Sequence, residues 1–323
     1  MYSPTRSTRQ WLLYSLFETI TDALDTVLMV IVRLKRPEKS LLPSDVDGLS
    51  DEQLLELRKT APVIDSIAGV VRLTPGTVAK PSKDLEEDPP DASEANALDL
   101  AFAKTMIPVP RDRRVINWEG GFLIVMDYIE GPTLAQAWPT LSKWRKLLVA
   151  FTLRRYIRQL RRLTQAPPGT PPGPLSTQVR ICESPVFGQV QSSRGPFASY
   201  AEMSAFFNQC HHMALENEDV PQDDPARKDL FDDSEPLVLT HQDLKLRNIM
   251  MDRNGRIWLV DWTWAGYYPP WFEYATMTIQ NERPVVSGTE DKFWQALIPF
   301  VCGTRYVRQL KWLTRMWGSF DYH

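Results

Sequence analysis

One short stretch of the sequence, LTHQDLKLRNIMMD at residues 239–252, places polar residues that could do chemistry between two apolar runs. Asp243 could accept a proton from a hydroxyl group or orient that group. Asn248, five residues later, could offer a carbonyl oxygen to a metal ion, and Asp261, after the apolar run RIWLV, could add a carboxylate oxygen of the kind that Mg²⁺ prefers. Phosphoryl transfer needs a metal and an oriented nucleophile, so these three residues together predict that reaction.

Two short strands and the turn between them are expected to hold these residues. NIMMD and RIWLV are apolar segments on either side of RNG, which is typical of a hairpin turn. Such a hairpin would place Asn248 and Asp261 side by side. Each residue alone has an ordinary explanation as an exposed turn residue, so it is the combination that indicates a site.

The chain before residue 130 favours strands with one helix between them. The stretch SDEQ, which begins at Ser50, has the form of a capping box at a helix start. Residues 70–80 indicate a hairpin in which Pro75 and Gly76 supply a type II turn, and the pair GG at residues 120–121 indicates a second hairpin. Between these hairpins, SEANALDLAFAKT has the apolar spacing of a short helix.

Two charged residues in this part of the chain are candidates for a nucleotide site. Lys80 closes an apolar strand, where a buried ammonium group is costly unless an anion meets it. An edge lysine that keeps its charge in water is the alternative. Glu94 stands near the start of the predicted helix, where it could pair with Lys80 or simply favour the positive end of the helix dipole.

After residue 140 the pattern becomes mainly helical. Residues 143–163 form the longest such stretch, with eight basic and no acidic side chains. We interpret it as a core helix with a basic face in water, and an anionic partner surface is the alternative. We therefore expect an α+β protein with a small β-rich N-lobe at residues 49–126 and a larger, mainly helical C-lobe at residues 127–323. An extension at residues 1–48 precedes the N-lobe, and a hinge at about residues 126–131 joins the lobes beside a cleft.

Composition narrows the class of protein. The chain has 323 residues with 37 basic and 40 acidic side chains, a net charge of −3, so we expect no nucleic-acid partner. Cys182, Cys210 and Cys302 are widely spaced and form no CxxC pair, which argues against a disulfide framework and a thiolate metal site. A reducing, cytoplasmic setting with three buried thiols is the expectation.

The N-terminal segment 11–36 is apolar, but Glu18, Asp22 and Asp25 interrupt it. Its longest uninterrupted apolar run is far shorter than the roughly 20 residues needed to cross a bilayer, and no signal-peptide cleavage site follows. We expect an amphipathic helix that docks on the protein itself. The alternative is a peripheral contact with a membrane or a partner, which the flanking basic residues would favour. The apolar positions of this helix are Leu13, Leu16, Phe17, Ile20, Leu24, Val27, Leu28 and Ile31.

Over residues 63–275 the chain resembles the protein-kinase-like superfamily, and within it the aminoglycoside phosphotransferase and choline kinase group. HQDLKLRN is similar to the catalytic loop HxDxxxxN of this group, and VDW to its metal-binding segment. TVAK resembles the strand with the phosphate-contacting lysine, SEANAL the helix with its glutamate partner, and MDYIEGPTL the adenine-binding hinge. VDWTWAGYYPPWFEYA is most similar to fungal members of the group.

The resemblance implies a bilobal kinase-like fold, ATP as donor, Mg²⁺ as cofactor and a hydroxyl group as acceptor. Within this loop we expect His241 to shape the backbone through hydrogen bonds rather than to act as a base, and Lys245 to contact a phosphate or else to face solvent. The other implied roles are Asp243 as base or orienter, Asn248 and Asp261 as metal ligands, Lys80 as phosphate contact, Glu94 as its partner, and Asp127, Tyr128 and Ile129 as adenine-binding backbone.

The sequence also departs from the kinase pattern. The glycine-rich GxGxxG loop is missing, since only Gly69 and Gly76 occur between residues 63 and 80. Backbone N–H groups at residues 66–69 are the remaining candidates for holding phosphates. A kinase-like binding or scaffold protein without catalysis is therefore the first alternative. No GxxxxGK[ST] motif occurs, which excludes a P-loop enzyme.

The stretch after Asp261 bears on the phosphate acceptor. It reads Trp-Thr-Trp, with no Ala-Pro-Glu and no long activation segment, so a small molecule is favoured over a Ser/Thr protein kinase substrate. Nine acidic residues between residues 216 and 235 and a group of aromatic residues could form a pocket for a cationic amine or amino alcohol. A solvated acidic loop and an aromatic packing cluster are the alternative. The aromatic residues are Trp262, Trp264, Tyr267, Tyr268, Trp271 and Phe272.

Overall fold

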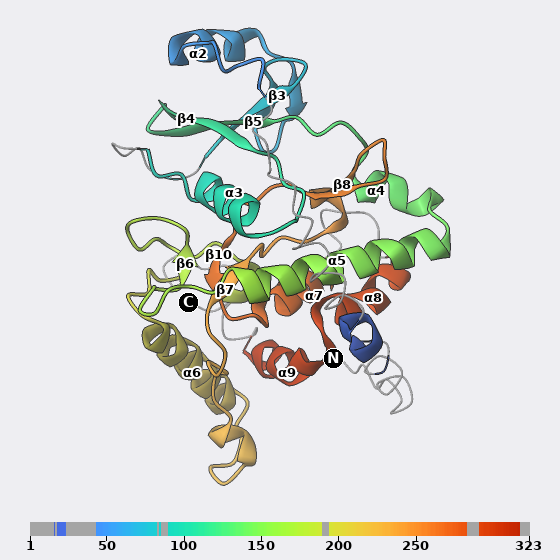
Figure 1. Ribbon diagram of the computed structural model, residues 1–323. Coiled ribbons are helices and arrows are strands. Elements are labelled where there is room, and N and C mark those ends of the chain that lie inside the picture. The colour runs from blue at the N-terminus through green and yellow to red at the C-terminus, as the bar shows by residue number, and fades with distance from the viewer. Residues whose placement is uncertain are drawn as a thin grey trace.

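The computed structural model describes residues 16, 18–23, 43–82, 84, 90–188, 194–282 and 291–316. These residues form a small lobe built on a sheet and a larger lobe built mainly of helices (Figure 1). The predicted α+β class, with a β-rich and a mainly helical lobe, is confirmed. We keep the division at residues 49–126 and 127–323 as a proposal; the last strand of the small lobe ends at Asp127.

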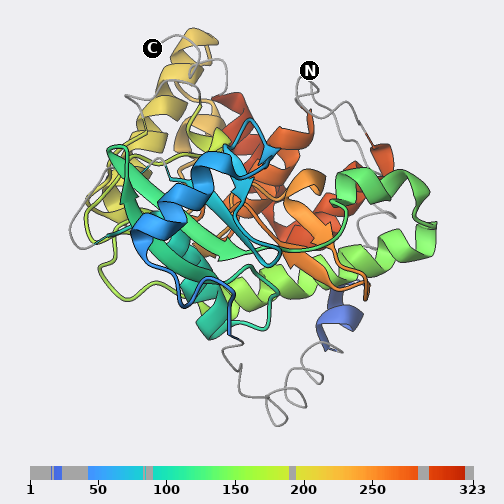
Figure 2. The same cartoon turned by 90° about the horizontal axis from the view of Figure 1, so that it is seen from above.

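The small lobe contains a five-stranded antiparallel sheet between two helices. The strand order is β1-β2-β3-β5-β4. One face packs against Leu54 of α2 and the other against Leu98 of α3, so β3 and β5 are covered on both sides (Figures 1 and 2). The elements are α2 (Asp51–Thr60), β1 (Val63–Asp65), β2 (Val70–Arg72), β3 (Thr77–Pro81), α3 (Ser93–Lys104), β4 (Asp112–Trp118) and β5 (Gly121–Asp127).

Local sequence signals account for most of this lobe. The capping box at Ser50 starts α2 as predicted, and both predicted hairpins form. The type II turn was wrong, because such a turn needs a positive φ at Gly76, which does not have one. Instead, the N–H of Gly76 donates to Oδ2 of Asp45 at 3.2 Å and to Oγ1 of Thr74 at 3.3 Å. The turn is therefore bound by a carboxylate from outside the hairpin and does not have type II geometry.

Helix α5 crosses the larger lobe from the region of β7 toward α4, on the side that faces the small lobe (Figure 1). A three-stranded sheet of order β6-β10-β7 and the hairpin β8-β9 carry the loops that face the small lobe. Its strands are β6 (Gly173–Pro174), β7 (Val238–Thr240), β8 (Ile249–Met251), β9 (Ile257–Leu259) and β10 (Gly266–Tyr268). Its helices are α4 (Leu134–Ala137), α5 (Lys143–Leu163), α6 (Tyr200–Asn217), α7 (Phe272–Glu282), α8 (Lys292–Cys302) and α9 (Val307–Arg315).

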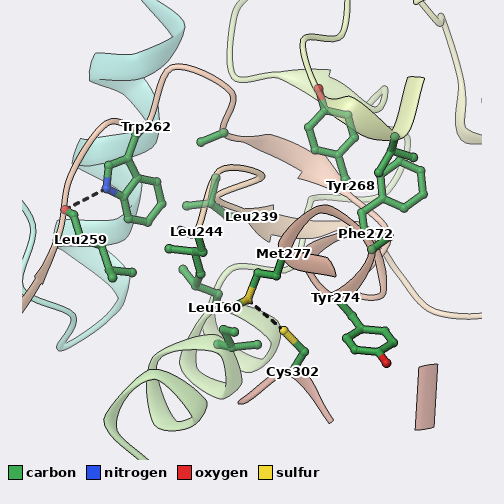
Figure 3. Packing of buried hydrophobic residues seen from close by; sticks show 14 of the residues in the cluster. Leu160, Leu239, Leu244, Leu259, Trp262, Tyr268, Phe272, Tyr274, Met277 and Cys302 are labelled. Carbon is green, nitrogen blue, oxygen red and sulfur yellow. Dashed lines mark hydrogen bonds between the residues drawn. The ribbon is translucent and has the colours of Figure 1, made fainter. Parts of the chain in front are cut away.

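The core of the larger lobe contains several aromatic side chains in a dense cluster (Figure 3). The ring of Tyr268 stacks on Phe272 with their centroids 5.8 Å apart, and Nε1 of Trp262 donates to the carbonyl oxygen of Leu259 at 3.2 Å. Cys302 is buried beside Met277. All three cysteines are buried free thiols, as expected from their spacing.

The basic side of α5 differs from the expectation of a solvated face. Arg154 and Arg158 are buried, and both donate to Oδ1 of Asp22 in the N-terminal segment, at 2.9 and 2.6 Å. Arg161 donates to the carbonyl oxygens of Cys302 and Pro270. These arginines therefore hold neighbouring segments in place, whereas the apolar side chain of Trp144 near the start of α5 is 66% exposed.

The N-terminal segment contacts the larger lobe, as predicted, and among its described residues the polar side chains of Glu18 and Asp22 make these contacts. Residues 18–23 are helical, and the Glu18 carboxylate accepts hydrogen bonds from N and Oγ1 of Thr304 at 2.8 and 3.1 Å. Leu16 and Ile20 are 57% and 48% exposed. The remaining apolar positions of the predicted helix lie outside the described residues. Within the described residues, no helix has the length and hydropathy to cross a membrane.

Candidate active site

The loop between β7 and β8 carries Asp243 on a framework of hydrogen bonds. Asn248, at the end of a single 3₁₀ turn at residues 246–248, donates from Nδ2 to Oδ2 of Asp243 at 2.7 Å. The other carboxylate oxygen, Oδ1, lies 2.7 Å from Nζ of Lys245 and also accepts a bond from Nε2 of Gln280 on α7. Burial raises the pKa of Asp243 even though Lys245 opposes the shift. The carboxylate is thus fixed in direction and more basic than an exposed aspartate.

The backbone is strained at two places beside this carboxylate. Gln242 and Asp261 have φ values of 65° and 63°, in the left-handed region that non-glycine residues rarely adopt. Only four non-glycine residues of the described chain have a positive φ, and two of them are in this site. Strained residues of this kind cluster at functional sites, where surrounding contacts hold them in place.

His241 joins the loop to the strand end that carries Asp261. Its Nε2 lies 3.1 Å from the carbonyl oxygen of Val260, and its Nδ1 accepts a bond from the N–H of Asp243 at 3.3 Å. We assign the ring proton to Nε2 from this pattern. Burial lowers the pKa of His241 to about 4, so the ring is neutral at pH 7. It serves as a bridge in the structure and does not face the oxygens of Asp243.

Glu273 of α7 binds the backbone of the same loop. Its Oε2 accepts a bond from the N–H of His241 at 2.6 Å. Burial raises the pKa of Glu273 to about 7 although the backbone N–H groups of His241 and Gln242 lower it. The buried carboxyl group therefore orders the two residues that precede Asp243.

Lys80 brings the two lobes together at one point. Its Nζ lies 2.8 Å from Oε1 of Glu94 on α3, 2.6 Å from Oδ1 of Asp261 and 2.6 Å from Oγ1 of Thr263. Burial opposes the charge on Lys80, but the two carboxylates outweigh it and raise its pKa. Glu94 also accepts a bond from the N–H of Trp262 at 3.0 Å, so it contacts both lobes.

Two oxygen atoms in the site are of the kind that binds Mg²⁺ and have no partner among the described residues. Nδ2 of Asn248 is used by Asp243, while Oδ1 of Asn248 and Oδ2 of Asp261 accept no hydrogen bond from any described residue. The two residues are adjacent because the N–H of Val260 donates to the carbonyl oxygen of Asn248 at 3.0 Å. Mg²⁺ is commonly held by one or two protein oxygens together with phosphates and water. No group of three acidic, His or Cys side chains in the described chain forms a complete metal site.

The predicted adenine-binding segment begins at Asp127, the last residue of β5. The N–H of Asp127 donates to the carbonyl oxygen of Arg111 at 3.0 Å, and the N–H of Tyr128 donates to that of Gly76 at 2.8 Å. The side chain of Asp127 pairs with Arg113 at 2.7 Å. Among the described residues, neither backbone polar group of Ile129 has a hydrogen-bond partner. Ile129 is therefore the member of this segment with a donor and an acceptor to offer.

The loop between β1 and β2 contains residues 66–69, whose amides were the candidates for holding phosphates in the absence of a glycine-rich motif. Oδ1 of Asp65 accepts bonds from the N–H groups of Ile67 at 2.8 Å and Ala68 at 3.1 Å. Two of the amides expected to face phosphates are thus occupied by the chain's own carboxylate. Ile67 at the tip is 88% exposed.

The proposed acidic, aromatic pocket is not formed as expected. Trp262, Tyr268, Trp271 and Phe272 are buried in the core, and only Trp264 and Tyr267 of this group are partly exposed. The acidic stretch at residues 216–235 begins in the last turn of α6, and three of its carboxylates pair with Arg227, Arg305 and Arg308. The packing alternative is therefore correct for most of these residues. Trp264 does lie near the catalytic loop, with its ring centroid 5.4 Å from Nζ of Lys245.

Sequence reasoning missed three residues that touch the predicted ones. Thr263 bonds Lys80, Glu94 and Asp261, Gln280 bonds the Asp243 carboxylate, and Glu273 bonds His241. A glutamate inside the otherwise apolar and aromatic segment PPWFEYA was a usable signal for Glu273. Gln280 is 37 residues from Asp243, and nothing in its neighbourhood marks it.

Comparisons with known proteins agree with this arrangement of the chain. Residues 70–301 match the profile of the phosphotransferase enzyme family. The match covers more than half of the 323 residues. The expected bilobal, protein-kinase-like fold is confirmed. No curated protein matches the sequence.

Several solved structures are similar to the chain. An aminoglycoside phosphotransferase from Streptomyces rimosus is 16% identical, with 81% of this chain and 94% of that chain covered and a TM-score of 0.44. A macrolide 2'-phosphotransferase from Brachybacterium faecium is 14% identical over 76% and 77%, with a TM-score of 0.38. A choline kinase from Streptococcus pneumoniae is 12% identical over 78% and 79%, with a TM-score of 0.33.

Proposed function

Because this chain belongs to the phosphotransferase enzyme family, we propose that it transfers the γ-phosphoryl group of ATP to a hydroxyl group of a small molecule. One observation carries the proposal. The structure brings Lys80 of the small lobe to within 2.6 Å of Asp261, on the strand end that His241 ties to the Asp243 loop. A phosphate-binding cation, a metal ligand and a base are the parts that phosphoryl transfer requires.

In the proposed step the acceptor oxygen forms a bond to the γ-phosphorus. The bond from that phosphorus to the bridging oxygen breaks, and ADP leaves. A carboxylate oxygen of Asp243 takes the proton of the acceptor hydroxyl. The raised pKa of Asp243 favours this transfer, and the bonds from Asn248 and Gln280 keep the carboxylate oriented.

The nucleotide would lie between the lobes. We assign the contact with its non-transferred phosphates to Lys80, which Glu94 holds in position at 2.8 Å. The backbone groups of Ile129 would meet the adenine edge. Asn248 and Asp261 would hold Mg²⁺ through the two oxygens that have no partner in the described chain. When bound, the ion would supply positive charge that neutralises phosphate oxygens.

Among small-molecule acceptors we propose a cationic amine or amino alcohol. The partly exposed ring of Trp264 beside the Asp243 loop supports this choice, because an aromatic face attracts a cation; an acceptor ammonium would displace Lys245, whose Nζ lies 5.4 Å from the ring centroid. The buried aromatic residues no longer support it. A protein acceptor is disfavoured by the absence of a long segment between Asp261 and α7, which begins at Phe272.

Release of ADP is the measurement that tests the function. Wild-type protein is incubated with ATP and Mg²⁺ and with a panel of amines, amino alcohols and sugars. Acceptor-dependent ADP release supports a small-molecule kinase. Binding of ATP without release for any acceptor would favour a kinase-like scaffold, and labelling of the protein itself or of peptide arrays would favour a protein kinase.

We also propose that this enzyme is cytoplasmic and that its N-terminal segment touches an anionic membrane surface. Leu16 and Ile20 support the proposal because they are exposed while Glu18 and Asp22 on the other side of the helix bind the larger lobe. Basic residues Arg33, Lys35 and Arg36 follow in the sequence. Co-sedimentation with anionic but not neutral vesicles is expected, and Leu16→Glu with Ile20→Glu should reduce it. Equal binding of the double variant would contradict this contact.

A further inference from the structure

A segment of the larger lobe, residues 173–184, reaches up to the small lobe, and we call it the strap. Its first residues form β6, which pairs with β10 through Gly173 and Tyr267. The pairing is close, because a Cβ atom on Gly266 would lie 2.3 Å from the carbonyl oxygen of Gly173. This end of the strap is therefore fixed to the sheet that leads into the Asp243 loop.

The middle of the strap ties the beginning of α3. Oδ2 of Asp91 accepts bonds from N and Oγ1 of Thr177, both at 2.7 Å. Nδ2 of Asn96 donates to the carbonyl oxygen of Leu175 at 2.8 Å and to Oδ1 of Asp91 at 2.6 Å. Helix α3 carries Glu94, so these bonds fix the helix that positions the partner of Lys80.

Arg180 of the strap acts on the start of α3 through a carboxylate. The N-cap residue of α3 is Ala92, which has no side-chain oxygen with which to cap the helix. Oδ2 of Asp84 accepts the N–H of Ser93 in its place at 2.7 Å. Nη1 of Arg180 lies 2.5 Å from Oδ1 of Asp84, and its Nη2 lies 3.7 Å from Asp91. Arg180 thus holds the substitute cap one residue before Glu94.

The last residue of the strap reaches the catalytic loop. Oγ of Ser184 donates to Oε1 of Gln242 at 2.7 Å, and Nε2 of Gln242 donates to Oγ1 of Thr240 at 2.8 Å. All three side chains are buried. These bonds help to hold Gln242 at its positive φ, directly before Asp243.

On the side of Glu94 that faces the strap, α3 borders a cavity, so polar contacts hold the helix there. A cavity of about 360 Å³ lies between the strap and α3, and Glu94, Thr263 and Arg180 are among its lining residues. A helix that borders a cavity has room to move once its ties are removed. The ion pairs of Arg180 are also mostly shielded from water, with side chains about one-tenth exposed, so solvent screens them less than surface pairs.

We propose that the strap positions both halves of the catalytic machinery, and that Arg180 is a positioning residue that keeps Glu94 directed at Lys80 through Asp84 and the start of α3. This inference rests on the proposed function for its kinetic consequences. Loss of Arg180 should mainly weaken productive nucleotide binding, while the Asp243 loop keeps its own tie at Ser184.

The test compares Arg180→Gln with Arg180→Lys and with a matched control. Arg227→Gln serves as the control, because Arg227 also pairs with a carboxylate at 2.5 Å, that of Glu216 in the last turn of α6. Amide hydrogen exchange at residues 93–98 reports directly on α3 in the protein without nucleotide. For Arg180→Gln we expect faster exchange there, a rise in the KM for ATP and about a tenfold loss in kcat/KM for ATP, with a smaller change in kcat. Arg180→Lys should recover part of the loss.

A double variant separates positioning from a general structural role. If Arg180 acts through Glu94, Arg180→Gln should cost little further activity in a Glu94→Gln background. Additive losses, or exchange at residues 93–98 equal to that of the Arg227→Gln control, would overturn the inference. If the wild-type protein transfers no phosphate to any acceptor, the proposed function fails, and the exchange measurement still decides whether the strap holds α3.

Discussion

Lys80 and Asp261 are 181 residues apart in the chain, yet Nζ of Lys80 lies 2.6 Å from Oδ1 of Asp261. Glu94 and Thr263 accept the other two N–H groups of this ammonium. The lysine is therefore directed by three oxygen atoms from two lobes. A phosphate that contacts Lys80 must share or replace one of them.

Thr263 is expected to contribute to this arrangement through its hydroxyl group. Thr263→Val keeps the shape of the side chain but removes the oxygen that lies 2.6 Å from Lys80. We expect a loss of about tenfold in kcat/KM for ATP, since a hydrogen bond to a charged group is worth about 1.5–3 kcal/mol. Steady-state kinetics measure this loss. Thr263→Ser restores the oxygen and should behave like the wild type; equal rates for the Ser and Val variants would contradict the role.

Removal of the Lys80 charge should affect stability as well as activity. Lys80→Met leaves Glu94 and Asp261 facing each other without their cation. We expect a fall of about 2 kcal/mol in the free energy of unfolding, below the value for a fully buried pair because Asp261 is partly exposed. Urea unfolding measures it. Adding Glu94→Gln should recover part of the loss, and a further fall in the double variant would argue against charge as the cause.

Glu273 gives the protein a specific pH dependence. Its pKa rises from 4.5 to about 7 on folding, so between these pH values the folded state keeps a proton that the unfolded chain releases. The contribution of Glu273 to stability therefore falls as the pH rises from about 4.5 to 7, by about 3 kcal/mol in total.

The Glu273→Gln variant isolates this effect, because glutamine keeps an acceptor for the N–H of His241. Its unfolding free energy relative to the wild type should increase between pH 4.5 and pH 8. His241, with a pKa lowered to about 4, titrates in the opposite sense in both proteins and cancels in the difference. A difference that stays constant with pH would show that Glu273 keeps an ordinary pKa.

Asp65 is expected to limit nucleotide affinity. Its carboxylate occupies the N–H groups of Ile67 and Ala68 in the loop between β1 and β2, which we propose lies beside the phosphates of the nucleotide. Asp65→Ala releases these donors and removes a negative charge, so we expect Kd for ATP to fall about threefold at low salt and less at high salt. Calorimetric titration measures the affinity. Weaker binding in this variant would show that the Asp65 bonds organise the loop for the nucleotide.

The sequence predicted the parts of the site that depend on local patterns. The hairpin β8-β9 follows from two apolar runs around RNG, and α3 and the capping box of α2 follow from local spacing. Contacts between distant segments were beyond local patterns. Gln280 contacts Asp243 only because α7 packs against the loop. Asp45 binds the N–H of Gly76 from 31 residues earlier in the chain.

The sequence also did not predict which aromatic and basic side chains are buried. The aromatic residues after Asp261 have the composition of a pocket, but Trp262, Tyr268 and Phe272 fill the core (Figure 3). The arginines of α5 have the composition of a solvated face, but Arg154 and Arg158 bind Asp22. Composition alone does not tell which side of a segment the rest of the fold will cover.

Transfer of the γ-phosphoryl group in the wild-type protein and in Asp243→Asn tests the central claim most directly. Both proteins are incubated with ATP and Mg²⁺ and the best acceptor of the panel, and phosphorus NMR follows the product. We predict a phosphate ester and an equal amount of ADP from the wild type, and no ester from Asp243→Asn with ATP binding largely retained. Equal rates of ester formation by the two proteins would contradict the assignment of Asp243 and the mechanism built on it.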